Sequence, residues 1–138
     1  MAGLDQQLER MADPALQTEA SWQLKHEMEG GACLDPAQEA RLLSLLPALE
    51  TWEAILHVLQ VLDRIAIPKP AAARAAAFVH AQLEHRRPFV RAWAFHALHH
   101  LAGQHPSYRA DFELRRAAAE EGESASVKAR LRNLKPWA

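Results

Sequence analysis

Apolar residues recur along the chain every three or four positions, which is the spacing of one face of an amphipathic helix. The clearest example runs from Pro88 to Gly103 and reads PFVRAWAFHALHHLAG. Proline suits the first turn of a helix and glycine suits its end, so we expect the helix to span this segment. Trp93 lies beside the apolar face, and we expect it to be largely buried. The face itself consists of Val90, Ala94, Ala97, Leu98 and Leu101.

The same spacing predicts further helices over residues 4–11, 14–29, 36–49, 52–65, 70–83, 106–122 and 126–134. Asp13 and Pro14 are expected to start the second of these, because aspartate caps helices and proline fits their first turn. Trp137 is expected to fold back over the exposed end of the last helix. The positions expected to face inward include Leu4, Leu8, Met11, Leu16, Ala20, Leu24, Met28, Leu42, Leu45, Leu46, Leu49, Trp52, Ile55, Leu59, Leu62, Ala72, Ala76, Val79, Leu83, Tyr108, Phe112, Ala119, Val127, Leu131 and Leu134, with Trp22, Leu114 and Ala118 beside them.

Signals for β-structure are missing from the sequence. No segment alternates polar and apolar residues, and no Asn-Gly or Asp-Gly pair marks a hairpin turn. Hydrophobic residues make up 49% of the chain and glycine is scarce, with 5 residues in 138, which also favours helices. The sequence therefore predicts an all-α protein.

Segments of the sequence repeat at a regular interval. His57 lies 39 residues before His96, and Leu59 and Leu62 match Leu98 and Leu101 in the same register. The run Val90-Arg91-Ala92 is matched 37 residues later by Val127-Lys128-Ala129. Pro36, Pro70 and Pro106 each open a predicted helix at intervals of 34 and 36 residues. A period in the thirties that contains two helices is typical of an α-solenoid.

The pattern Val-Arg-Ala, then Ala-Leu, then a second helix and a short loop with Pro or Asp resembles the HEAT repeats of armadillo-type proteins. The resemblance covers residues 51–135 best and residues 13–50 weakly. It implies a right-handed α-α superhelix of about three and a half HEAT-like repeats, formed by residues 1–138 as a single domain. Most proteins of this class are interaction scaffolds, and a few are enzymes.

The resemblance also implies where a partner would bind, because the second helices of HEAT-type repeats line the concave surface. The chain is therefore expected to be a non-enzymatic scaffold or adaptor that needs no cofactor and presents this surface to a protein partner. The outward positions on those helices, by the proline register, are Glu39, His80, Glu84, Glu113, Arg116 and Glu120.

Charge is distributed unevenly although the net charge is −1. Residues 1–69 contain 11 acidic and 5 basic side chains, whereas residues 70–138 contain 6 acidic and 11 basic ones. Basic residues on the last two helices could contact phosphate, which makes weak nucleic-acid binding an alternative function, although nucleic acid is not the expected partner. These residues can also serve to solvate the terminal repeat. The basic patch consists of Arg115, Arg116, Lys128, Arg132 and Lys135.

Three histidines give a second alternative, a metal-dependent enzyme. His96, His99 and His100 lie three and four positions apart on one predicted helix, a spacing that lets imidazoles converge on a metal ion. No carboxylate stands at ligand spacing beside them, so we expect helix-surface histidines and no bound metal.

Cys33 is the only cysteine in the chain and cannot form an internal disulfide, which favours a reducing compartment. No run of about 18 apolar residues could span a bilayer, and no secretory segment is recognisable at the N-terminus. We therefore expect a cytoplasmic protein that does not bind membranes. We expect a monomer at moderate salt, with weak head-to-tail association at low salt at most.

Overall fold

The computed structural model describes residues 3–137, and all regular structure in that range is helical, with no strand. The all-α prediction is therefore confirmed for this range. The chain divides into two compact units, residues 1–67 and residues 68–138, which are described separately. Within residues 3–137, no helix is both long enough and apolar enough to cross a membrane.

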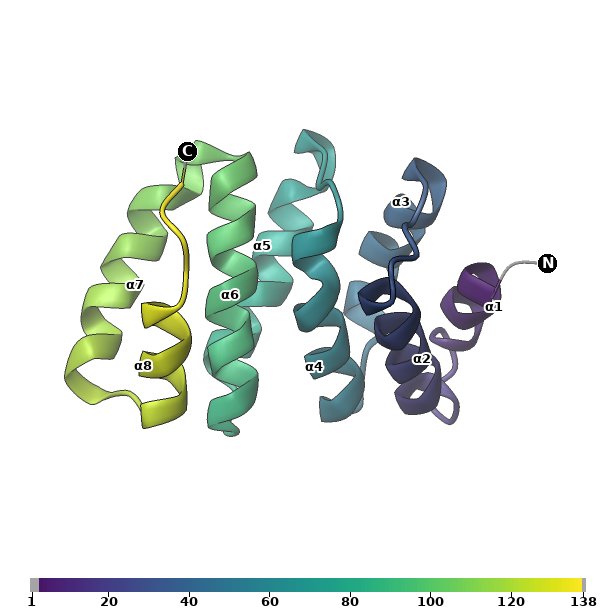
Figure 1. Cartoon of the computed structure of the whole chain (residues 1–138), viewed down its shortest axis with the longest axis horizontal. Helices are drawn as coiled ribbons and strands as arrows, with labels where there is room; N and C mark the ends of the chain where they lie inside the picture. The colour runs from purple at the N-terminus through teal and green to yellow at the C-terminus, as the bar shows by residue number, and fades with distance from the viewer. Residues whose placement is uncertain (1–2, 138) are drawn as a thin grey trace. The chain divides into compact units, whose positions relative to one another are not determined.

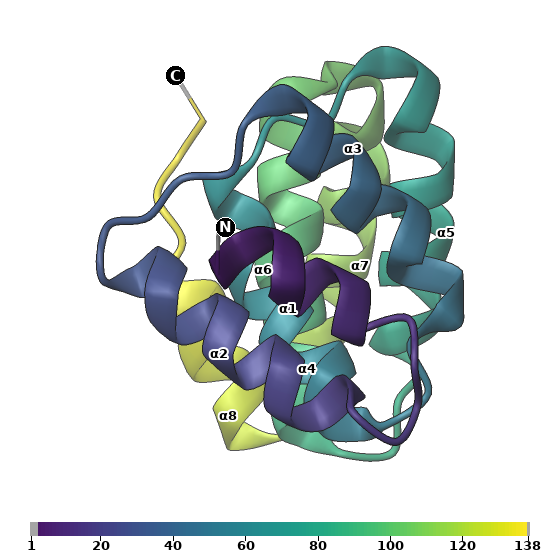
Figure 2. The ribbon, with the colours of Figure 1, turned by 90° about the vertical axis from the view of Figure 1, so that its right-hand side faces the viewer.

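The first unit contains four α-helices and two short 3-10 helices. They are α1 (Gly3–Arg10), α2 (Gln17–Glu29), α3 (Pro36–Leu45), η1 (Leu46–Ala48), α4 (Trp52–Val61) and η2 (Leu62–Arg64). Helix α1 packs on both α2 and α3, and α2 packs on α4 (Figure 2). The core of this unit includes Leu8, Met11, Leu24, Leu42 and Leu59, as the apolar spacing predicts.

Local capping explains where two of these helices begin. The Asp35 carboxylate accepts a hydrogen bond from the Gln38 backbone N–H at 2.8 Å, and the Gln38 side chain accepts one from the Asp35 N–H at 2.9 Å. This reciprocal capping box, with Pro36 in the first turn, starts α3. The Thr51 hydroxyl accepts from the Ala54 N–H at 3.2 Å and starts α4.

The start predicted for the second helix is wrong. Residues 11–16 form turns, and α2 begins at Gln17, because the Asp13 carboxylate accepts from the Ala15 N–H and caps a turn instead of a helix. Two side chains expected to lie on or beside the inward face are therefore outside: Leu16 is 46% exposed and Trp22 is 51% exposed. Trp22 stacks on His26 at 5.2 Å between ring centres.

Gln17 is completely buried and takes the place expected for Leu16. Its amide nitrogen donates to the carbonyls of Met11 and Ala48, both at 3.0 Å. Its amide oxygen accepts from the backbone N–H groups of Glu50, at 2.6 Å, and Thr51, at 3.1 Å. One side chain thus joins the loop after α1 to the loop before α4.

The second unit contains four α-helices and one 3-10 helix. They are α5 (Lys69–Leu83), α6 (Pro88–Gln104), η3 (Pro106–Tyr108), α7 (Arg109–Gly122) and α8 (Ala125–Arg132). Helix α6 packs against α5, α7 and α8, and so forms the centre of this unit (Figure 1). The Ser124 hydroxyl caps α8 by accepting from the Val127 N–H at 3.5 Å.

The inward face predicted for residues 88–103 is confirmed, since all five of its residues are buried on α6. Trp93 borders this face and is half-buried, so the expectation that it would be largely buried holds in part. Its ring lies 4.7 Å from the His96 ring and 4.4 Å from the Arg130 guanidinium. Phe95 is 5% exposed and is the buried aromatic residue of this helix.

Other expectations for the second unit hold in part. Phe112, Ala119, Val127 and Leu131 are buried as predicted, Leu134 is half-buried, and Leu114 is 73% exposed. Trp137 folds back as predicted, but its hydrogen bond and its ring contacts are with α6 and α7 and not with the end of α8. Its indole N–H donates to the His99 carbonyl at 2.9 Å, and its ring stacks on the His99 ring at 4.8 Å.

Candidate functional site

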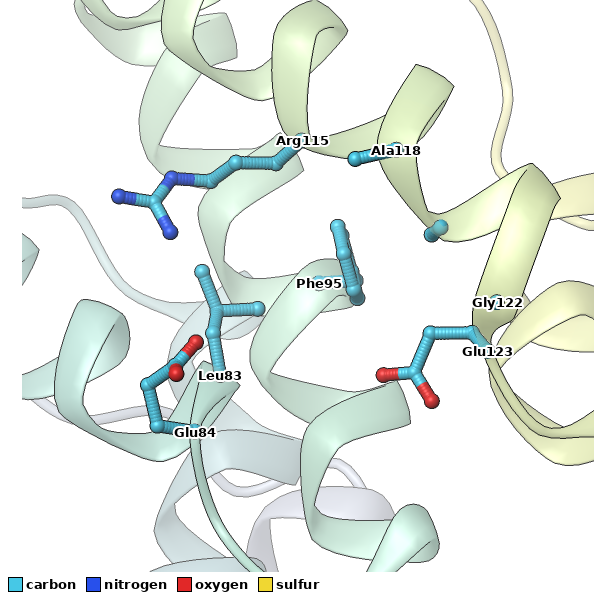
Figure 3. A pocket seen from close by; sticks show the side chains of 8 residues that line it. Leu83, Glu84, Phe95, Arg115, Ala118, Gly122 and Glu123 are labelled. Carbon is cyan, nitrogen blue, oxygen red and sulfur yellow. The ribbon is translucent and has the colours of Figure 1, made fainter.

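A hollow between helices α5, α6 and α7 is one candidate site, and we call it the Phe95 groove. Its volume is about 220 Å³. Figure 3 shows the Phe95 ring at its centre, with Arg115 and Glu84 on one side and the Glu123 carboxylate on the other. The hollow exists because small residues of α7 face the ring. The groove is lined by Leu83, Glu84, Phe95, Arg115, Ala118, Ala119, Gly122 and Glu123.

Arg115 is held in position by a carboxylate on its own helix. Asp111 accepts from the Arg115 Nε at 2.9 Å and lies 2.8 Å from the Nε2 of His80 on α5. Burial opposes ionisation of Asp111, but the hydrogen bonds from Arg115 and His80 outweigh it and lower the pKa of the carboxyl. Asp111 therefore stays charged, and it links α5 to the rim of the groove.

Glu123 at the other side of the groove is paired with Arg91 of α6. The Arg91 Nε donates to Oε2 at 2.8 Å and Nη2 donates to Oε1 at 2.9 Å, a two-bond geometry that only arginine offers a carboxylate. The hydrogen bonds from Arg91 lower the pKa of Glu123. Arg91 also donates to the carbonyls of His85 and Arg86. The pair therefore joins the loop between α5 and α6 to the loop between α7 and α8.

The sequence did not reveal these two networks. Arg91 is the charged residue of the Val-Arg-Ala motif. Its place in that motif was the one sequence signal that could have suggested a carboxylate partner on a neighbouring helix. Glu123 and Asp111 carry no motif of their own. Their roles follow from the packing of helices that are distant in sequence.

The six residues expected on the concave surface do not gather in one hollow. Glu84 lines the Phe95 groove, whereas Arg116 and Glu120 line a different hollow. His80 is paired with Asp111. Glu113 is exposed and lies 3.8 Å from Arg116. Glu39 belongs to the first unit, where its carboxylate accepts from the Ala66 N–H at 3.1 Å.

Three of the five residues of the predicted basic patch come together between α7 and α8. Arg116, Lys128 and Arg132 line a hollow of about 200 Å³ with Glu120 and Leu131, which we call the basic hollow. Arg115 points instead to the Phe95 groove. Lys135 is exposed in the segment that follows α8.

The three histidines considered as metal ligands have different neighbours. His96 packs against the Trp93 ring, the His99 ring lies between Trp137 and Phe112, and His100 bonds to Gln104 at 2.8 Å. Burial lowers the pKa of His99, and the positive charges around it lower the pKa further. Across residues 3–137, no group of three His, Cys, Asp or Glu side chains could hold a metal ion.

Comparison with known proteins gives no relative to reason from: no protein-family model, no curated protein and no solved structure matches this chain.

Proposed function

We propose that the chain is a non-enzymatic binding module that receives part of a protein partner in the Phe95 groove. The observation that carries this proposal is the chemistry of the groove. An aromatic ring and aliphatic side chains form its floor, and charged side chains that are already fixed by Asp111 and Arg91 form its rim. Apolar centres with polar rims are typical of protein interfaces.

The size of the groove favours a side chain of a partner over a free metabolite. Pockets that enclose small molecules have volumes of about 300–1,000 Å³. The Phe95 groove, at about 220 Å³, is smaller and suits one or two apolar side chains. We further propose that both units belong to one HEAT-like right-handed superhelix of about three and a half repeats in the cytoplasm, as the repeat period of the sequence suggests.

Two neighbouring alanines of α7 allow a matched test. Ala118 and Ala117 are both exposed, but Ala118 lines the groove and Ala117 does not. A small aliphatic diazirine amino acid at position 118, which leaves most of the groove open, should capture a defined protein in the native cell, and the same group at position 117 should not. The variant Ala118→Trp should fill the groove and abolish capture by a crosslinking group at Glu84, which also lines the groove. The variant Ala117→Trp should leave that capture unchanged.

Equal capture from both positions, or capture that survives Ala118→Trp, would remove the support for the groove. The competing proposal, a metal enzyme using His96, His99 and His100, is tested by metal analysis of protein purified without a histidine tag. Stoichiometric zinc or iron that is lost in the His96→Ala and His99→Ala variants would favour the enzyme.

A further inference from the structure

The basic hollow holds an excess of positive charge on facing helices. Lys128 and Arg132 are four residues apart on α8, so they lie on one face of it, and Arg116 and Glu120 have the same relationship on α7. The hollow therefore contains three cations and one anion around Leu131, which is 4% exposed. The wall between the charges is largely carbon, because the aliphatic stems of long basic side chains cover apolar surface.

Two of the three cations of the hollow, those of Lys128 and Arg132, are not paired with a carboxylate in the part of the chain that the structure describes. Within residues 3–137, neither Lys128 nor Arg132 forms an ion pair or a side-chain hydrogen bond. Arg116 lies 3.8 Å from Glu113, which is too long for a hydrogen bond. By contrast, Arg91 and Arg115 in the same unit each have a carboxylate within 2.9 Å. Lys128 and Arg132 are therefore available to an external anion, and Arg116 has only the long, exposed contact with Glu113 to give up.

We propose that the basic hollow receives a carboxylate side chain, with an apolar neighbour, from an acidic peptide segment of a protein partner. The inference rests on the proposed function in that it treats the chain as a binding module, but it concerns a different surface. The carboxylate lies between Lys128 and Arg132, with Arg116 opposite, and the apolar neighbour lies against Leu131 and the aliphatic stems. The volume of about 200 Å³ accommodates a guest the size of a side chain.

The arrangement favours a peptide over a nucleic acid. A nucleic acid extends a line of phosphates well beyond one hollow and needs a continuous basic surface. Glu120 lies inside the basic hollow, and the exposed Glu113 and Glu121 lie on the same helix, so the surroundings repel an extended polyanion. In a peptide complex, Glu120 instead accepts a backbone N–H from the guest.

Fluorescence anisotropy with defined probes tests the inference. The first probe is a short labelled peptide in which glutamate and leucine alternate, and the second has glutamine in place of each glutamate. The third is a labelled single-stranded oligonucleotide with the same net charge as the first peptide. The double variant Lys128→Gln/Arg132→Gln removes two charges from the hollow. The control Arg74→Gln/Arg86→Gln removes two exposed charges elsewhere in the same unit.

We expect the wild-type chain to bind the acidic peptide and not the glutamine peptide. The Lys128→Gln/Arg132→Gln variant should weaken binding about tenfold or more, since paired interfacial charges contribute this much, and the control should weaken it less than about twofold. Circular dichroism spectra of both variants establish that they are folded.

Three outcomes would overturn the inference. The acidic peptide does not bind, the two double variants weaken binding equally, or the oligonucleotide binds more tightly with the same dependence on Lys128 and Arg132. None of these outcomes affects the Ala118 crosslinking test, because Lys128 and Arg132 do not line the Phe95 groove. Failure of the inference and failure of the proposed function are therefore distinguishable.

Discussion

The guanidinium of Arg130 lies 4.4 Å from the centre of the Trp93 ring, so a residue of α8 covers an aromatic residue of α6 from the solvent side. A cation over an indole face is stabilising by about 0.5–2 kcal/mol, depending on how far it is desolvated. The contact covers part of the Trp93 ring, which borders the apolar face of α6 and is half-buried.

The first prediction concerns this pair. Trp93→Ala should lower the free energy of unfolding by about 1–2 kcal/mol. This is less than the loss of about 3–5 kcal/mol that is typical for a fully buried tryptophan. A double-mutant cycle with Arg130→Ala should give a coupling of about 0.5–1 kcal/mol, measured by urea unfolding. Additive effects of the two substitutions would contradict a direct contact.

The second prediction concerns Gln17. Gln17→Ala should destabilise the chain by about 2–4 kcal/mol, because two backbone carbonyls and two backbone N–H groups lose their partner. The exposed Gln6 gives the matched control, and Gln6→Ala should change the free energy of unfolding by less than about 0.5 kcal/mol. Similar urea midpoints for the two variants would show that the Gln17 bonds are dispensable.

The third prediction concerns the pH dependence of the Arg91–Glu123 pair. The pKa of Glu123 is lower in the folded chain than in the unfolded one, where a glutamate titrates near about 4.3. The pair therefore stabilises fully above that pH and loses its effect as the pH falls through the folded pKa. Glu123→Gln should cost about 1–2 kcal/mol at neutral pH, and the gap from wild type should narrow in acid. A gap that does not change between neutral and acidic urea titrations would contradict the prediction.

The fourth prediction concerns His57 in the first unit. Burial lowers the pKa of His57, and the charge of Lys25 lowers it further. The unfolded chain therefore takes up a proton near about pH 6.5 before the folded chain does, and stability falls as the pH drops through that value. His57→Gln should reduce this loss of stability between neutral pH and about pH 5. An NMR titration of the His57 ring should give a midpoint below that of an unstructured histidine, and a higher midpoint would refute the assignment.

The fifth prediction concerns association. We expect a monomer at moderate ionic strength, with weak association at most when salt is low, because contacts between exposed charges contribute about 0–1 kcal/mol each and are screened. Sedimentation velocity at low and moderate ionic strength measures this directly. A dimer that persists at both would indicate an apolar interface.

The sequence was sufficient to predict most helices because their ends are determined by neighbouring residues. Thr51 and Ser124 cap α4 and α8, and Pro36 and Pro88 occupy the first turns of α3 and α6. Such signals act over three or four residues, so they can be identified in a single chain. Asp13 was misleading because the same side chain also caps a turn.

Burial was harder to predict where it depends on distant neighbours. Hydrophobic spacing assigned Leu16 to the core, but Gln17 occupies the interior because four backbone groups from two connecting segments require its amide. Similarly, spacing cannot show that Ala118 and Gly122 leave a hollow opposite Phe95. An amphipathic pattern specifies which face is inward, and the fit between faces decides where a groove opens.

Helix α7 separates the Phe95 groove from the basic hollow, with Arg115 beside one and its neighbour Arg116 beside the other. If both proposals hold, a partner segment that crosses this helix would contact two surfaces a few residues apart. Once the first is engaged, the second is presented at a high effective concentration, and its association becomes an intramolecular step. Under the two proposals, each surface binds its own part of the partner, and a segment that occupied both would dissociate more slowly than one held by either alone.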